Sequence, residues 1–289
     1  GLGDVYKRQK KYFVKTFGCQ MNEHDSERIS GMFELDGMSK AISEEYADVL
    51  FVNTCTIREN ADDKLYGTLG QLKQWKSQKD NRKLLVGGCA AQKDKELVRE
   101  KAPWVDVVIG THNLTNVVDL LNRSEDWGPL TEIIDEIETL PTEAPSIRES
   151  EYSAWVTIQI GCNNSCTFCI VPSVRGQEIS RRPSDIVNEA KKLVDEGVKE
   201  ITLLGQNVNS YGRDLKIEGK ARPYFSQLLE QLNDIKGLER IRFTSPHPKD
   251  FKAETIESVK KLKNVCNQVH VPLQSCLLYT SPSPRDLYQ

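Results

Sequence analysis

Short apolar runs alternate with amphipathic stretches through residues 11–123, and this alternation is the strongest constraint on the fold. The apolar runs have the length of strands, and the stretches between them repeat their apolar residues at helical spacing. We expect strands at Tyr12–Thr16, Asp48–Asn53, Lys83–Gly87 and Asp106–Ile109, and helices at about Asp25–Leu35, Ala61–Lys76, Asp94–Lys101 and Asn113–Leu121. Alternating strands and helices predict βαβ units with right-handed crossovers, and therefore a parallel sheet.

A second series of the same kind occupies residues 152–275. Its expected strands are Trp155–Ile160, Glu200–Leu204, Arg240–Phe243 and Gln268–Val271, and its expected helices are Ser184–Glu196, Tyr224–Asn233 and Ala253–Lys263. Four strands are too few to close a barrel, so this series predicts a partial (βα) barrel. The predicted fold class is α/β, with a parallel-sheet domain followed by an incomplete barrel, and a length of 289 residues fits two domains.

Residues 124–151 interrupt the alternation. They contain nine acidic side chains against one basic side chain, together with Pro141 and Pro145, and we expect them to form a solvated linker between domains 11–123 and 152–275. Residues 1–10 and 276–289 show neither helical nor strand periodicity. They resemble translated adapter sequence, so we expect two non-native tails and place Cys276 outside the chemistry.

The overall charge gives no sign of a nucleic-acid-binding surface. The net charge is −3 and the isoelectric point about 5.9, so any contact with RNA must be local or come from a part that is missing from this sequence. No run approaches the roughly 18 apolar residues of a membrane span, and no secretion signal opens the chain. We therefore expect a cytoplasmic protein without membrane contact. Because disulfides are disfavoured in the cytosol, the eight cysteines point to metal binding or catalysis.

Three cysteines each follow a predicted strand of the first series. They are Cys19 in TFGCQMN, Cys55 in VNTCTIREN and Cys89 in GGCAAQ. Because the carboxyl ends of parallel strands share one edge of a sheet, these thiols are expected to converge there. Three thiolates suit an iron–sulfur cluster or a zinc site. The alternative is that three small residues simply fill tight turns.

Three further cysteines, Cys162, Cys166 and Cys169, form a CxxxCxxC motif directly after the strand expected at Trp155–Ile160. A ferredoxin run would contain a fourth cysteine, and a zinc site would usually show paired CxxC elements. Three thiolates on a four-iron cluster leave one iron open to a further ligand. The motif therefore favours a cluster that binds a small molecule.

This motif after the first barrel strand resembles the radical S-adenosylmethionine (SAM) superfamily. The segment Gly161–Arg182, together with TFGCQMN, VNTCTIREN and GGCAAQ, resembles the methylthiotransferase family within it, and most of all the branch that acts on N6-isopentenyladenosine in tRNA. The resemblance covers about Lys11 to Ser275. Family members continue beyond that point with more βα units and a small RNA-binding domain.

The resemblance implies two 4Fe–4S clusters and SAM as cofactors. It assigns one cluster to Cys162, Cys166 and Cys169, which it makes catalytic, and an auxiliary cluster to Cys19, Cys55 and Cys89. The implied reaction cleaves SAM to a radical and transfers a methylthio group to carbon 2 of the base, beside the anticodon of tRNA. A flavodoxin- or ferredoxin-like electron donor and a monomeric enzyme are also implied.

Four residues are assigned to SAM by the same resemblance. Phe168 is expected to line the adenine, Gln206 and Asn207 to accept from the ammonium group, and Ser245 to contact the ribose. The alternative for Gln206 and Asn207 is a turn or helix cap. A separate set of arginines, Arg175, Arg181 and Arg182, is available for the SAM carboxylate or RNA phosphates, unless it forms a solvated basic turn.

Two other functions remain open from the sequence. A methylthiotransferase acting on threonylcarbamoyladenosine or on a ribosomal protein is the nearest enzymatic alternative. A structural zinc-binding module without catalysis is the alternative from another class.

Overall fold

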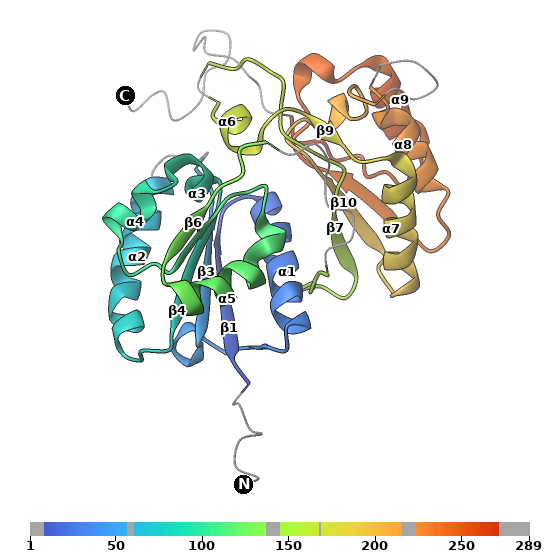
Figure 1. The fold of residues 1–289 in the computed structure, drawn as a ribbon. Helices are drawn as coiled ribbons and strands as arrows, with labels where there is room; N and C mark the ends of the chain where they lie inside the picture. Colours follow the sequence, from blue (N-terminus) through green and yellow to red (C-terminus); the bar gives the residue numbers. More distant parts are fainter. Residues whose placement is uncertain (1–8, 57–60, 137–144, 168, 216–222, 272–289) are drawn as a thin grey trace, which may run out of the picture. The chain divides into compact units, whose positions relative to one another are not determined.

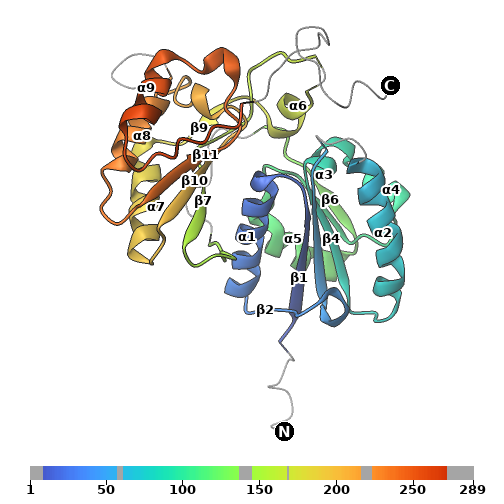
Figure 2. The same ribbon diagram turned by 180° about the vertical axis from the view of Figure 1, so that it is seen from behind.

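The computed structural model describes residues 9–56, 61–136, 145–167, 169–215 and 223–271, and they form two compact units (Figures 1 and 2). The first unit consists of residues up to Glu149 together with Gly161–Ile179. The second unit consists of Ser150–Ile160 and the residues from Ser180 onward. The segment that carries the CxxxCxxC motif therefore belongs to the first unit, although the segments on both sides of it belong to the second.

The first unit is built on a sheet of six parallel strands in the order β2-β1-β3-β4-β5-β6. The strands are β1 Lys11–Phe17, β2 Ser39–Lys40, β3 Val49–Thr54, β4 Lys83–Gly88, β5 Val107–Ile109 and β6 Leu130–Glu132. Every residue of β3 is buried, as its almost unbroken apolar sequence predicts for a central parallel strand.

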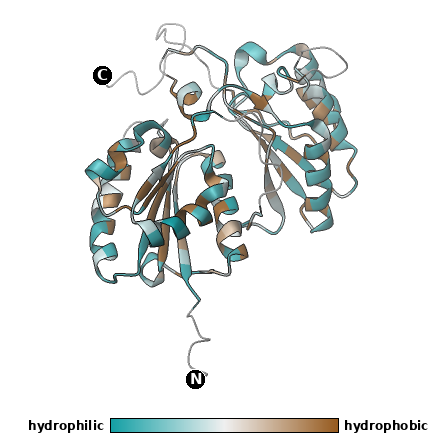
Figure 3. Ribbon diagram, viewed as in Figure 1, coloured by the Kyte–Doolittle hydropathy of each residue, from teal (hydrophilic) through white to brown (hydrophobic). Residues whose placement is uncertain are grey.

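Helices cover both faces of this sheet. They are α1 Gln20–Leu35, α2 Ala61–Ser77, α3 Cys89–Asp94, α4 Leu97–Lys101 and α5 Val117–Trp127, with 3₁₀ turns at Glu44–Tyr46 and Leu114–Asn116. Alternate residues of β3 enter different cores because strand side chains alternate between faces. Leu50 and Val52 pack with apolar residues of α2 and α4, whereas Val49 and Phe51 pack with α1 and α5. Figure 3 shows hydrophobic residues gathered along the strands and on parts of the helices.

Two details of the first unit differ from expectation. The helix expected at Asp94–Lys101 is two helices, α3 and α4, and the first begins at Cys89. Lys95 separates them with a φ of 50°, a left-handed conformation that interrupts helical hydrogen bonding. The first part of the acidic segment also forms regular structure, because α5 continues to Trp127 and β6 adds a strand to the sheet.

The second unit contains a smaller parallel sheet of three strands in the order β11-β10-β7. The strands are β7 Ser153–Thr157, β10 Glu200–Leu204 and β11 Arg240–Phe243. The helices are α7 Pro183–Asp195, α8 Phe225–Asn233 and α9 Ala253–Lys261, with 3₁₀ turns at Val208–Ser210 and Pro248–Asp250. One apolar core joins the strands to the helices. Two short strands, β8 Gln159–Ile160 and β9 Ile179–Ser180, pair with each other.

The strand expected at Gln268–Val271 is not formed. Among the described residues after α9, pairing with β11 is limited to the bridge between Ile241 and Val265, where the Ile241 N–H donates to the Asn264 carbonyl and the Cys266 N–H donates to the Ile241 carbonyl. Beyond this point the Gln268 side chain accepts a hydrogen bond from Arg242. Residues 268–271 form no series of backbone hydrogen bonds with another described strand. The prediction of a fourth strand is therefore wrong.

Candidate functional site

The first three cysteines follow three neighbouring strands of the six-stranded sheet. Cys19 lies two residues after β1 and is the N-cap of α1, Cys55 follows β3 directly, and Cys89 begins α3 immediately after β4. Because β1, β3 and β4 are adjacent and parallel, the three residues lie at the same edge of the sheet. This is the placement that the sequence predicts.

Two of these thiols interact with each other. A hydrogen bond from Cys55 is the largest influence on Cys19, and with N–H groups of Met21 and Asn22 in the first turn of α1 it lowers the pKa of Cys19 to about 6. Thiolates at helix N-termini are stabilised in this way because N–H groups and the helix dipole favour negative charge. Cys19 is therefore prepared to act as a thiolate ligand.

A buried network of amides and hydroxyls lies next to Cys19 and Cys55. The Asn22 side chain donates to Asn53 Oδ1 at 3.0 Å, and the Asn53 side chain donates to the Asn22 carbonyl at 2.8 Å and to Ser26 Oγ at 2.9 Å. Asn22 Oδ1 in turn accepts from the Cys19 thiol at 3.4 Å. The network fixes the turn that carries Cys19 against the end of β3.

Cys89 has a different environment, dominated by one arginine. Arg175 Nε lies 3.3 Å from Cys89 Sγ, and Arg175 Nη2 donates to Asp25 Oδ2 at 2.8 Å. Burial raises the pKa of Cys89, and the positive charge of Arg175 opposes that rise. Burial also opposes the charge of Arg175, but Asp25 keeps the pKa of Arg175 above its ordinary value. The guanidinium is therefore a permanent positive charge beside the thiols.

The second set of cysteines lies on the loop at 162–169, within the first unit. Cys162 is buried, whereas Cys166 and Cys169 are exposed. Burial raises the pKa of Cys162, and the charges of Glu178, Cys169 and Cys166 raise it further. Cys166 and Cys169 therefore both act on Cys162, and these two cysteines face solvent.

Backbone contacts close this loop at its base. The Cys162 N–H donates to the Gly176 carbonyl at 3.1 Å, and Glu178 N–H donates to Asn163 Oδ1 at 3.0 Å. Gly161 has a φ of 76°, and a Cβ there would lie 1.9 Å from the Gln177 carbonyl oxygen. Only glycine fits this closure.

Two of the residues expected to contact SAM, Gln206 and Asn207, lie after β10 in the second unit. Asn207 is buried and its Nδ2 donates to Asp250 at 2.8 Å, while its Oδ1 accepts no hydrogen bond. Gln206 Oε1 is also buried without a donor. Gln159 was not expected from the sequence. It is fully buried, donates to the Asn207 carbonyl at 2.7 Å and likewise leaves its Oε1 without a donor.

Buried amide oxygens without donors are uncommon, because each normally finds a partner. Gln159, Gln206 and Asn207 each leave such an oxygen in the second unit, and an amide oxygen of this kind can accept a hydrogen bond from a ligand that donates one, such as an ammonium group. Ser245, after β11, is exposed and has a φ of 55°. That left-handed conformation is strained for a residue with a side chain, and such strain is frequent at ligand sites. Phe168 lies outside the described residues.

The three arginines have three different environments. Arg175 is buried against Cys89 and Asp25, and Arg181 is buried where it donates to the Thr157 carbonyl and pairs with Glu189. Only Arg182 is exposed. Arg175 and Arg181 are therefore held within the protein. Contrary to one expectation from the sequence, they are not exposed to RNA phosphates.

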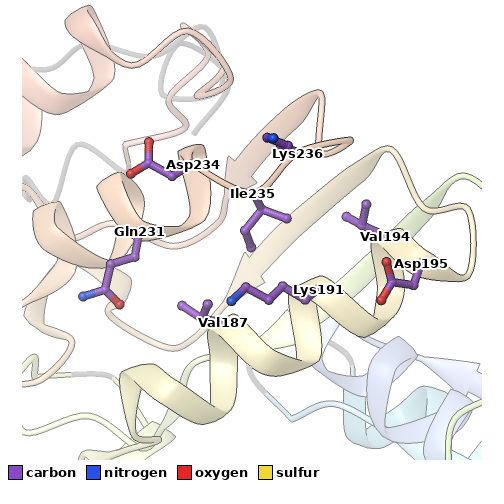
Figure 4. Close-up of a pocket in the computed structure, with 8 residues that line it drawn as sticks. All are labelled: Val187, Lys191, Val194, Asp195, Gln231, Asp234, Ile235 and Lys236. Atoms are coloured by element: carbon purple, nitrogen blue, oxygen red, sulfur yellow. The ribbon is translucent and has the colours of Figure 1, made fainter.

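A pocket of about 520 Å³ opens elsewhere in the second unit, between α7 and α8 (Figure 4). Its lining residues are Val187, Lys191, Val194, Asp195, Gln231, Asp234, Ile235 and Lys236. They include no cysteine and none of the orphaned amides, so we do not assign this pocket to the site. Among the described residues, no three His, Cys, Asp or Glu side chains converge on a single metal ion. In the same part of the chain, no helix is long and apolar enough to cross a membrane.

Two family profiles match the chain, one in each series of strands and helices. Residues 11–110 match the uncharacterized protein family UPF0004, and residues 156–277 match the radical SAM superfamily. Each profile covers one of the two cysteine sets. These matches bear out the resemblance inferred from the cysteine motifs.

Curated relatives are about half identical to this chain over the residues that align. The tRNA-2-methylthio-N(6)-dimethylallyladenosine synthase of Corynebacterium efficiens is 53% identical over 270 residues, which is 92% of this chain and 51% of that protein. The protein of the same name from Nocardia farcinica is 51% identical over 271 residues, or 93% of this chain and 54% of its own length. The chain thus spans about half the length of the curated relatives it matches.

Solved structures share the fold at low sequence identity. The radical S-adenosylmethionine methyltransferase TsrM from Kitasatospora setae superposes with a TM-score of 0.58 at 11% identity, over 92% of this chain and 59% of that one. The cobalamin-dependent S-adenosylmethionine radical enzyme OxsB gives a TM-score of 0.57 at 12% identity, over 93% of this chain and 44% of that one. These structures confirm the predicted α/β fold class.

Proposed function

The chain belongs to the radical SAM methylthiotransferase family, and on that premise we propose that it adds a methylthio group to carbon 2 of N6-isopentenyladenosine beside the anticodon of tRNA. The observation that carries the proposal is the presence of two separate sets of three cysteines. One set lies at the carboxyl edge of the six-stranded sheet, and the other lies on a closed loop after β8. The relatives named for this reaction support the choice of substrate.

The donor chemistry of the two sets fits four-iron clusters, in which each thiolate binds a different iron and three side chains need not converge on one ion. Cys162, Cys166 and Cys169 offer three thiolates on a loop that is partly open to solvent, so one iron stays free for SAM. Cys19, Cys55 and Cys89 offer three more, beside a guanidinium that offsets their negative charge. When bound, the clusters and SAM supply the electron transfer, the methyl group and the radical chemistry.

The protein's own groups bind and orient these partners. The orphaned oxygens of Gln159, Gln206 and Asn207 accept hydrogen bonds from the SAM ammonium group, and Ser245 contacts the ribose. Asp250 holds the Asn207 amide so that its oxygen remains free for this contact. Phe168 is assigned to the adenine. A flavodoxin- or ferredoxin-like protein delivers the electrons to a cytoplasmic, monomeric enzyme.

The test separates the two cysteine sets by their products. We expect anaerobic reconstitution to load about eight irons and an equal amount of acid-labile sulfide, as two four-iron clusters require. Replacing Cys162, Cys166 and Cys169 by alanine should halve the iron and abolish reductive cleavage of SAM to 5′-deoxyadenosine. Replacing Cys19, Cys55 and Cys89 should also halve the iron but leave that cleavage in place, while stopping methylthiolation.

Cys266 provides the matched control, since it is a partly buried cysteine of neither set. Cys266→Ala should retain the full iron content and the cleavage activity. Equal loss of 5′-deoxyadenosine in both triple variants would contradict two independent clusters. A colourless chain that takes up zinc instead of iron and sulfide would favour the structural zinc module.

A further inference from the structure

Arg175 connects the loop of one cysteine set to a sulfur of the other. It is the last residue of the short helix α6 Val171–Arg175, which follows the CxxxCxxC motif after one intervening residue. Its side chain is buried and reaches Cys89 Sγ through Nε at 3.3 Å. Both residues belong to the first unit, so this contact lies within one compact body.

The surroundings of Arg175 hold it in place. Asp25, in the second turn of α1, accepts from Nη2 at 2.8 Å and supplies the counter-charge that a buried guanidinium needs. Thr111 Oγ1 donates to the carbonyl of Val174 at 2.6 Å, and α6 packs against α3, the helix that Cys89 begins. The donor and the sulfur are therefore positioned by helices in contact.

The charge of Arg175 acts on two thiols of this edge, Cys89 and Cys19. It favours the thiolate at Cys89 through a hydrogen bond and through charge, and it favours the thiolate at Cys19 through charge. Asp25 engages Nη2 rather than Nε, so the Nε donor remains directed at Cys89. A guanidinium suits this arrangement because its fixed fork serves two partners at once.

We propose that Arg175 is a positioning residue for the auxiliary cluster, donating an N–H···S hydrogen bond to Cys89 and raising the reduction potential of that cluster. This inference rests on the proposed function. Hydrogen bonds to cluster sulfurs and nearby positive charge both stabilise the reduced state, since reduction adds a negative charge. Arg175 ends the helix that follows the SAM-binding cysteines, so its contact with Cys89 also links the positions of the two cysteine sets.

The first experiment isolates the auxiliary cluster. In a chain with Cys162, Cys166 and Cys169 replaced by alanine, one cluster remains, and its potential is measured by redox titration followed by electron paramagnetic resonance. Adding Arg175→Gln should leave iron and sulfide unchanged but lower the equilibrium constant for reduction about tenfold, or about 59 mV for one electron. Arg182→Gln, an exposed arginine close in sequence, is the control and should leave the potential unchanged. An unchanged potential in the loaded Arg175→Gln chain overturns the proposal.

A second experiment does not depend on the glutamine variant loading its cluster. The same triple-alanine chain is produced with ¹⁵N-arginine, and pulsed electron paramagnetic resonance is used to detect ¹⁵N coupling to the reduced cluster. We expect a coupling that disappears in Arg175→Lys and persists in Arg182→Lys. A loaded cluster without ¹⁵N coupling overturns the role of Arg175 alone, whereas a parent chain that binds no iron or sulfide overturns the proposed function as well.

Discussion

The Asn22 side chain donates to Asn53 Oδ1 at 3.0 Å, and Asn53 donates back to the Asn22 carbonyl at 2.8 Å, so that α1 and β3 are joined by two buried amide hydrogen bonds. Both residues are fully buried. Each lies close in sequence to a cysteine of the auxiliary set, Asn22 to Cys19 and Asn53 to Cys55. The stability of the turn that carries Cys19 therefore depends on a buried polar pair, which Ser26 extends by a further hydrogen bond.

Removing one partner of this pair should destabilise the first unit. Asn53→Ala deletes the donor to Ser26 and leaves the Asn22 amide buried without an acceptor at Asn53, which costs about 1–3 kcal/mol of unfolding free energy. Denaturant unfolding of the cluster-free chain measures the effect. Asn116→Ala is the control, because Asn116 is exposed and makes only a 3.4 Å contact with Glu132, so its change should stay within about 0.5 kcal/mol.

Two glycine-to-alanine substitutions should change the free energy of unfolding in opposite directions. Gly88 precedes Cys89 with a φ of 90°, and a Cβ there would lie 2.4 Å from Asn53 Oδ1 and 2.5 Å from the Thr54 carbonyl oxygen. Gly88→Ala should therefore destabilise the chain by more than about 1 kcal/mol and lower iron uptake at the auxiliary site. Gly67 lies exposed within α2 with nothing near its added Cβ, so Gly67→Ala should stabilise by up to about 1 kcal/mol. Equal unfolding midpoints for the two variants would contradict the strain assigned to Gly88.

The Cys19 thiol should titrate at lower pH than an ordinary thiol in the cluster-free chain. Hydrogen bonds from Cys55 and the start of α1 lower its pKa to about 6, so alkylation of Cys19 should rise steeply as the pH passes through about 6. Because the folded chain favours the Cys19 thiolate, ionisation of this thiol stabilises the fold. The stabilisation is complete above the ordinary thiol pKa and is lost as the pH falls through about 6. Cys162 serves as the internal control, because burial raises its pKa and its alkylation should begin at higher pH.

Alkylation is followed by mass spectrometry of the cysteine-containing peptides across a pH series, under anaerobic, metal-free conditions. Cys55→Ala removes the thiol that donates to Cys19 and should move the Cys19 profile to higher pH. An unmoved profile would show that α1 alone sets the reactivity.

Loss of an orphaned acceptor should weaken SAM binding. Gln206→Leu removes a buried oxygen that has no donor within the described residues, and a hydrogen bond to a charged ammonium contributes about 1.5–3 kcal/mol. The Kd for SAM, measured by calorimetry on the reconstituted chain, should rise by about tenfold to a hundredfold. Gln231→Leu is the matched control on the exposed face of α8 and should leave the Kd unchanged. A Kd that stays the same for Gln206→Leu would remove Gln206 from the SAM site.

The sequence predicted the parts of the fold that depend on local pattern. The strands Glu200–Leu204 and Arg240–Phe243 are observed at their expected bounds, the first as a mostly apolar run and the second as an alternation of arginine with apolar residues. The edge shared by Cys19, Cys55 and Cys89 was also predictable, since parallel strands place their carboxyl ends together. Gln268–Val271 has a similar alternation, yet no neighbouring strand pairs with it, and pattern alone does not supply a partner.

The polar contacts that organise the site could not be predicted in the same way. Arg175 and Asp25 are separated by 150 positions, and nothing in either local sequence indicates that they pair. Asn53 gave a weaker signal, as a polar residue within the apolar run DVLFVN, where burial requires a partner. The orphaned oxygen of Gln159 becomes visible only once its hydrogen bonds can be counted.

The segment Gly161–Ile179 folds with the first unit although the residues before and after it fold with the second. The chain therefore passes between the two units three times, and no single cut separates them. A recombinant that joined residues 1–149 of one relative to the remainder of another would take Asp25 from one parent and Arg175 from the other. We expect residues 1–149 and the remainder of the chain to diverge together, because a change at Asp25 restricts the changes that are tolerated at Arg175. The two parts should therefore not be exchangeable between relatives.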